Sequence, residues 1–207
     1  MSSEVDKRHS FEPDRFAADI YESVNSLKIK EEKLILFGSS VGCMSILEAY
    51  KNHPIQAHST ILNEPVMKLN LPSYGQIIAK FIPEAFVNSF KPFMKWYVTR
   101  IMVKDPAKNK KLVQRYLHTI DNLEGWKLKN FACRFRKYTL RYQLKKIKIN
   151  NSCSLIGSKL DALHDIEQTE EMSKALGAEY TVFEQSEKTR GSNLAQLIYD
   201  KFVEKSI

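Results

Sequence analysis

The chain has 207 residues, 43% of them hydrophobic and 27% charged, which suits a globular protein with room for one sizeable core. Its net charge of +8 admits anionic partners, but no stretch resembles a nucleic-acid-binding module, and no apolar run approaches the ~18 residues of a membrane span. Three scattered cysteines argue against a disulfide framework or a zinc site, and together with a polar N-terminus they favour a cytoplasmic protein.

The first part of the chain alternates between helical and strand patterns. Apolar residues at helical spacing predict an amphipathic helix over residues 16–27, and a short apolar run predicts a strand over 33–37. A second helix is expected over 40–52 and a second strand over 57–65.

Residues 66–146 have a different character, with several helical stretches punctuated by prolines and many aromatic and methionine side chains. Their basic, amphipathic end, residues 134–148, is interpreted as a solvated helix face, with contact to an acidic membrane surface as the alternative. The aromatic residues could form an apolar pocket or belong to an ordinary core.

The last part of the chain returns to alternation, with strands at 153–157 and 179–184 and helices at 166–176 and 194–205. Such alternation predicts an α/β protein whose mostly parallel sheet of about four strands has helices on both faces. We therefore expect a core built from residues 1–65 and 147–207, and a helical cap formed by 66–146 at the carboxyl ends of the strands.

The strand-to-helix junction at Gly38-Ser39-Ser40-Val41-Gly42 carries the main functional signal. A serine on a strained turn, with glycine two residues before and after it, presents its Oγ, and Gly38 and Gly42 supply the small residues. Ser40 is then the candidate nucleophile, and the amide of Val41 is a candidate oxyanion donor at a helix N-terminus. The alternative interpretation is a tight turn with no chemistry.

This junction resembles the nucleophile elbow of the α/β-hydrolase superfamily, and the resemblance extends over nearly the whole chain. Residues 34–42 resemble the fifth strand and elbow of that family, 59–65 its sixth strand, 152–165 its seventh strand and acid loop, and 178–184 its eighth strand. Residues 6–10 resemble the segment after the fourth strand, although both of its glycines are absent.

The resemblance implies a serine hydrolase that forms an acyl-enzyme on Ser40 from a small-molecule carboxylic ester or thioester, with no metal and no cofactor. It also implies a catalytic acid a few residues after the seventh strand, where Asp161 stands and Asp165 is a weaker candidate. Asp161 would orient a histidine and stabilise its imidazolium form. Otherwise Asp161 caps a helix or lies in a loop.

The sequence departs from the family at the catalytic histidine, which is absent from the loop over residues 184–191. A serine hydroxyl without a base is a weak nucleophile, so Lys188 and His118 are considered as substitutes, although two nearby glutamates favour a charged Lys188. The alternative is a catalytically degenerate protein that binds a hydrophobic ligand or a protein partner.

A second departure is the small number of residues before the first helix, where the family has further strands. The elbow strand would then lie at an open edge of the sheet, and an exposed apolar edge tends to aggregate unless it is covered. A homodimer, a second polypeptide that supplies the missing strands or the N-terminal tail could cover it, and the sequence could also be a fragment.

Overall fold

The computed structural model of the chain describes residues 11–68, 84–103, 106–107, 110–135, 138–159, 166–184, 189 and 191–200. It divides into two compact units. A sheet unit comprises Glu12–Leu69 and Tyr138–Ile207, and a helical unit comprises Asn70–Lys137 together with Phe11.

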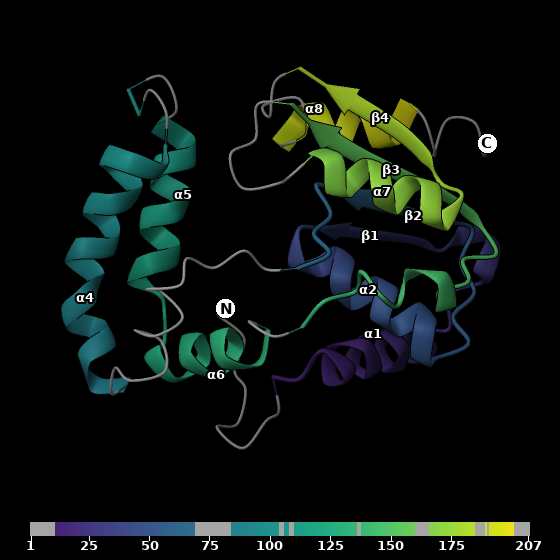
Figure 1. Ribbon diagram of the computed structural model, residues 1–207, viewed down its shortest axis with the longest axis horizontal. Coiled ribbons are helices and arrows are strands. Elements are labelled where there is room, and N and C mark those ends of the chain that lie inside the picture. Colours follow the sequence, from purple (N-terminus) through teal and green to yellow (C-terminus); the bar gives the residue numbers. More distant parts are fainter. Residues whose placement is uncertain are drawn as a thin grey trace. The chain divides into compact units, whose positions relative to one another are not determined.

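The sheet unit is built on four parallel strands that lie in sequence order, β1 (Ile35–Ser39), β2 (Ser59–Asn63), β3 (Ser152–Ser158) and β4 (Glu179–Phe183), as Figure 1 shows. This arrangement confirms the predicted α/β class and the four-stranded parallel sheet. Because the strands are parallel, their carboxyl ends lie along one edge of the sheet. Among the described residues, β1 has β2 as its one strand neighbour.

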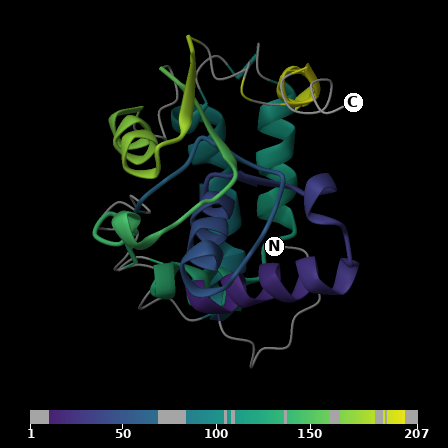
Figure 2. The same cartoon turned by 90° about the vertical axis from the view of Figure 1, so that its right-hand side faces the viewer.

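Helices cover both faces of this sheet. In Figure 1, α7 (Ile166–Leu176) lies in front of the sheet and α8 (Gly191–Ile198) behind it, and in the turned view of Figure 2 the light-green α7 and the yellow α8 stand on opposite sides. The α8 side is filled by a cluster of buried Ile61, Ile156 and Leu194. Alternation along the strands directs Leu36, Leu62 and Leu155 to the other face.

Two helices precede and follow β1, namely α1 (Pro13–Leu27) and α2 (Val41–Asn52), and they pack against each other. The helix predicted from residue 16 begins at Pro13 because proline suits the first helical turn. The strand predicted over residues 33–37 lies two residues later, because Glu31–Lys33 forms a 3-10 turn in which the Lys33 N–H donates to the Lys30 carbonyl.

The helical unit contains α4 (Glu84–Tyr97), a π-helical segment η2 (Val98–Met102), α5 (Lys110–Asp121) and α6 (Gly125–Phe135). Pro92 lies inside α4 instead of ending it. Buried Val98, Val103 and Ile120 form a small core between η2 and α5, and Met94 of α4 packs against it. The expectation of one basic helix over residues 134–148 is wrong: α6 ends at Phe135, and the described chain resumes with a β-bridge and a short 3-10 helix, Leu144–Lys146.

The chain leaves and re-enters the sheet unit at one place. Lys68 and Thr139 form an antiparallel bridge, and the Leu140 N–H donates to the Met67 carbonyl at 2.9 Å. The two ends of the inserted segment are therefore held together by backbone hydrogen bonding.

Candidate active site

Ser40 occupies a strained turn between β1 and α2. Its φ of 53° and ψ of −116° lie outside the regions that L-residues ordinarily adopt, at a cost of roughly 1–3 kcal/mol. Hydrogen bonds fix the turn on both sides, because the Ser40 N–H donates to the Asn63 carbonyl and the Ser40 carbonyl accepts from the Cys43 N–H, each at 3.0 Å. The Ser40 side chain does not cap α2. The turn therefore holds this serine in a conformation that its own backbone preference would not select.

The two glycines of the motif differ in the space that is available for a side chain. A Cβ added to Gly38 would lie 2.9 Å from Ile46 Cδ1 and 3.0 Å from the Cys43 nitrogen, so the strand can approach α2 only with glycine at this position. A Cβ added to Gly42 would meet no atom of the described residues within 4 Å. The close approach of β1 to α2 thus depends on Gly38. The expectation that both glycine positions must be small therefore holds, on steric grounds, for Gly38 only.

A buried polar network lies beside the turn, at the end of β2. Asn63 donates from Nδ2 to Ser39 Oγ at 3.3 Å and to the Thr189 carbonyl at 3.1 Å. The Thr189 hydroxyl donates to Glu64 Oε1 at 2.6 Å, and both residues are almost fully buried. These contacts anchor the chain after β4 to the strand end next to the elbow.

Sequence reasoning missed this network, although one signal was available. An asparagine and a glutamate follow directly on the apolar run of β2, at positions that burial makes costly unless the polar groups find partners. The Asn63 Oδ1 atom is itself buried and has no hydrogen-bond partner within the described part of the chain.

The other predicted site residues are distributed as follows. Asp161, Asp165 and Lys188 lie outside the described residues. Asp161 follows the last residue of β3 by three positions, and parallel strands place that strand end on the same sheet edge as Ser40, ~10 Å away across β2. Lys188 directly precedes the anchored Thr189. His118 lies on α5 of the helical unit, is exposed, and has its ring nitrogens 3.3 Å from Asn122 Nδ2.

The two thiols of the sheet unit, Cys43 and Cys153, are poorly suited to nucleophilic chemistry. Burial raises the pKa of the Cys43 thiol far above its ordinary value, and burial raises the pKa of Cys153 to about 12. Both therefore stay protonated at neutral pH, and a protonated thiol is a weak nucleophile. Within the described ranges, no three His, Cys, Asp or Glu side chains form a group that could hold a metal ion.

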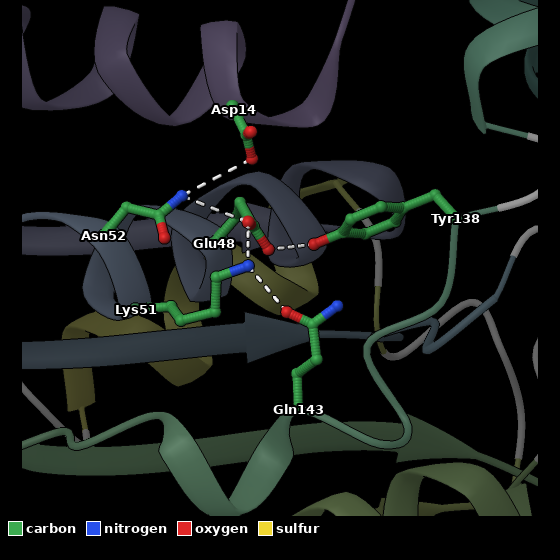
Figure 3. Close-up of polar contacts among 6 residues, drawn as sticks. All are labelled: Asp14, Glu48, Lys51, Asn52, Tyr138 and Gln143. Carbon is green, nitrogen blue, oxygen red and sulfur yellow. Dashed lines mark hydrogen bonds and ion pairs between the residues drawn. The ribbon is translucent and has the colours of Figure 1, made fainter.

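A second polar cluster surrounds Glu48 on α2, and Figure 3 shows its contacts. The buried Glu48 carboxylate pairs with Lys51, accepts a hydrogen bond from the Tyr138 hydroxyl, and accepts another from Asn52 Nδ2 at 3.1 Å. The Lys51 ammonium also donates to Gln143 Oε1 at 2.7 Å. The cluster thus ties α2 to the segment that returns from the helical unit.

The pKa values of this cluster indicate that Glu48 keeps its negative charge. Burial acts to raise the pKa of Glu48, but the hydrogen bonds from Lys51 and Tyr138 outweigh it, so that the pKa lies below its ordinary value. Burial, followed by the bond to Glu48, raises the pKa of Tyr138. The hydrogen bond that Asp14 of α1 shares with Glu48 raises the pKa of Asp14. A carboxylate with all these partners is better suited to joining structural elements than to exchanging protons.

No protein-family model and no curated protein matches the chain. Solved structures do resemble it. An esterase from Exiguobacterium antarcticum superimposes with a TM-score of 0.73 at 18% identity, covering 100% of this chain and 77% of that one. A malate-bound thermophilic esterase from Thermogutta terrifontis gives 0.74 at 13% identity, covering 96% and 74%. The enol-lactonase from Burkholderia xenovorans gives 0.69 at 14% identity, covering 93% and 72%.

These similarities, with the parallel sheet and the strained turn after β1, define the class of protein: the chain has the α/β-hydrolase fold. The expected resemblance to that superfamily is therefore confirmed at the level of the fold. At such low identity, the comparison does not extend to the reaction.

Proposed function

We propose that the protein is a serine hydrolase that cleaves a carboxylic ester or thioester through an acyl-enzyme on Ser40. The observation that carries this proposal is the backbone of Ser40, held at positive φ between a parallel strand and the N-terminus of α2. Strain of this kind concentrates at functional sites, and in the nucleophile elbow it exposes the serine Oγ.

The proposed reaction has two stages. Ser40 Oγ attacks the carbonyl carbon and passes its proton to a base, and the Val41 N–H stabilises the oxyanion that forms. The bond to the leaving group then breaks, and the alcohol or thiol departs with a proton. Water attacks the acyl-enzyme, releases the carboxylic acid and restores the serine hydroxyl.

The solved neighbours support the proposed class of substrate. Two of those compared are described as esterases and a third as an enol-lactonase, and a lactone is a cyclic ester. Ester carbonyls are the groups that an activated serine attacks readily, so a carboxylic ester is the substrate class that agrees with both the fold and the turn.

Lys188 is the base that we assign to this reaction. It precedes Thr189, whose carbonyl is bonded to Asn63 in the network beside Ser39. A lysine acts as a base when its pKa is lowered, and serine–lysine pairs are an established variant of the catalytic triad. Asp161, beyond the end of β3, would orient the base in this scheme, and His118 is the competing candidate for the base itself.

The test is active-site labelling with a fluorophosphonate, followed by intact mass measurement. We expect one adduct on the wild-type protein, none on Ser40→Ala, and unchanged labelling on Ser23→Ala, which alters an exposed serine of α1 outside the site. Lys188→Met should abolish labelling, whereas His118→Gln should retain it.

Unlabelled wild-type protein with a folded circular dichroism spectrum would overturn the proposal and would favour a binding protein without catalysis. Labelling that survives in Ser40→Ala would overturn the assignment of the nucleophile.

A further inference from the structure

Helix α4 carries apolar side chains on two neighbouring sides, which lie roughly a quarter-turn apart at 3.6 residues per turn. One side carries Val87, buried at 8% exposure, and Met94, which packs on the small core formed with α5. The other side carries large side chains that remain between 39% and 57% exposed, namely Phe86, Phe90, Phe93, Trp96 and, in η2, Ile101. We call these five residues the aromatic stripe. The apolar part of a surface helix ordinarily coincides with its buried side, so its extension over these exposed side chains indicates a further apolar contact.

The rings of the aromatic stripe pack on one another. Phe90 and Phe93 meet edge to face with centroids 6.4 Å apart, and Phe93 and Trp96 stack at 5.6 Å. The stacked contact uses one face each of Phe93 and Trp96, so fewer open ring faces remain for stacking nucleic-acid bases. The stripe instead presents exposed apolar side chains along the helix.

The positive charge of the protein is concentrated in the same unit. Residues 70–137 hold 14 of the 32 Lys and Arg residues but only 4 of the 24 Asp and Glu residues, a balance of +10. The rest of the chain is therefore slightly acidic. Several of these cations are exposed in the helical unit, including Arg100, Lys110, Arg115 and Arg134.

We propose that the aromatic stripe docks on the surface of a bilayer that contains anionic phospholipid. Aromatic side chains insert at the level of the headgroups, and surrounding lysines and arginines are attracted to acidic lipid. A second copy of this chain is a poor occupant, since it would bring the same positive charge to the contact. In the described part of the chain, no helix is both long and apolar enough to cross a membrane.

The test is sedimentation of the full chain with vesicles of phosphatidylcholine, with and without phosphatidylglycerol. We expect binding only to the anionic vesicles and release by 0.5 M NaCl, because screening at high salt weakens charge attraction. Phe90→Ser with Phe93→Ser should lower the partition coefficient at least tenfold. Arg100→Gln with Arg115→Gln should lower it about fivefold for each charge removed. Tyr142→Ser is the matched control, since that ring is 85% exposed in the sheet unit, and it should bind like the wild type.

A second measurement reports the orientation. The chain has two tryptophans, the exposed Trp96 and the buried Trp126, so brominated acyl chains should quench the fluorescence of Trp96 only, and Trp96→Phe should abolish the quenching. Failure to bind anionic vesicles, binding that is unaffected by Phe90→Ser with Phe93→Ser, or displacement from vesicles by equimolar single-stranded RNA would each overturn the proposal. None of these outcomes depends on the reactivity of Ser40.

Discussion

Ser40 and Glu64 follow the paired residues Ser39 and Asn63 at the ends of neighbouring strands, and both have positive φ, 53° and 47°. Each backbone N–H continues the sheet hydrogen bonding, from Ser40 to the Asn63 carbonyl at 3.0 Å and from Glu64 to the Ile156 carbonyl at 2.7 Å. Two adjacent strands thus end in conformations that cost roughly 1–3 kcal/mol for a residue with a side chain. The surrounding sheet must supply that energy.

Replacing Ser40 by glycine should stabilise the protein. Glycine adopts positive φ without the steric cost of a Cβ, so we expect Ser40→Gly to raise the free energy of unfolding by about 1 kcal/mol relative to Ser40→Ala. Ser40→Ala is the matched control because it removes the hydroxyl but keeps the Cβ. Urea unfolding measures both, and equal stability would contradict the strain at this residue.

The two motif glycines should respond in opposite ways to alanine. Gly38→Ala places a methyl group 2.9 Å from Ile46 Cδ1 and 3.0 Å from the Cys43 nitrogen, so we expect a loss of about 1–3 kcal/mol in the free energy of unfolding. Gly42→Ala lies inside α2 with open space at the Cβ position, and should gain up to about 1 kcal/mol through helix propensity. Thermal or urea denaturation of the pair tests both signs.

Thr189→Val should destabilise the protein by roughly 1–3 kcal/mol, because it leaves the buried Glu64 carboxyl without its 2.6 Å hydrogen bond. Thr119→Val is the control, since the Thr119 hydroxyl bonds to the Arg115 carbonyl on the exposed surface of α5. Urea unfolding of the two variants should separate them clearly. A Thr189→Val protein as stable as Thr119→Val would show that the anchor contributes little.

Glu48→Gln should cost roughly 2–3 kcal/mol at pH 7, since it removes one partner of a largely buried ion pair. The folded-state pKa of Glu48 lies below the ordinary 4.5, so its stabilisation is present above about pH 4.5 and is lost as the pH falls through the lower folded value. The difference between wild type and variant should therefore shrink below pH 4.5.

Unfolding curves measured from pH 7 to pH 3 would follow this dependence. Glu170→Gln, which removes an exposed ion pair with Lys174, is the control and should cost well under 1 kcal/mol. A pH-independent difference for Glu48→Gln would contradict the assignment of a fixed charge.

The sequence predicted the sheet well because its signals are local. Short apolar runs with turn residues at their ends predicted β1 to β4. The alternation of these runs with helical patterns predicted that the strands are parallel. Element boundaries were less accurate. Lys33, where a strand was expected to begin, is the last residue of the 3-10 turn Glu31–Lys33. Pro92 did not end α4, since a proline's effect depends on the contacts that surround it.

The candidate site was predicted only in part, for a different reason. The turn at Ser40 has a local motif, whereas the contacts of Thr189 with Asn63 and Glu64 join residues more than a hundred positions apart. No spacing rule indicates such pairs. The Glu48 cluster was missed for the same reason. Its contact between Tyr138 and Glu48 joins residues on either side of the inserted helical segment.

The bridge between Lys68 and Thr139 makes the helical unit a replaceable module. Since both ends of the insertion already lie side by side, the chain between them can be shortened or exchanged at little cost in loop-closure entropy, which changes only slowly with length. A short turn could join residue 68 to residue 139 while leaving the sheet, the elbow and the Glu48 cluster covalently intact. The same scaffold can therefore carry different insertions, and with them different surfaces, without changes to the strands of the sheet.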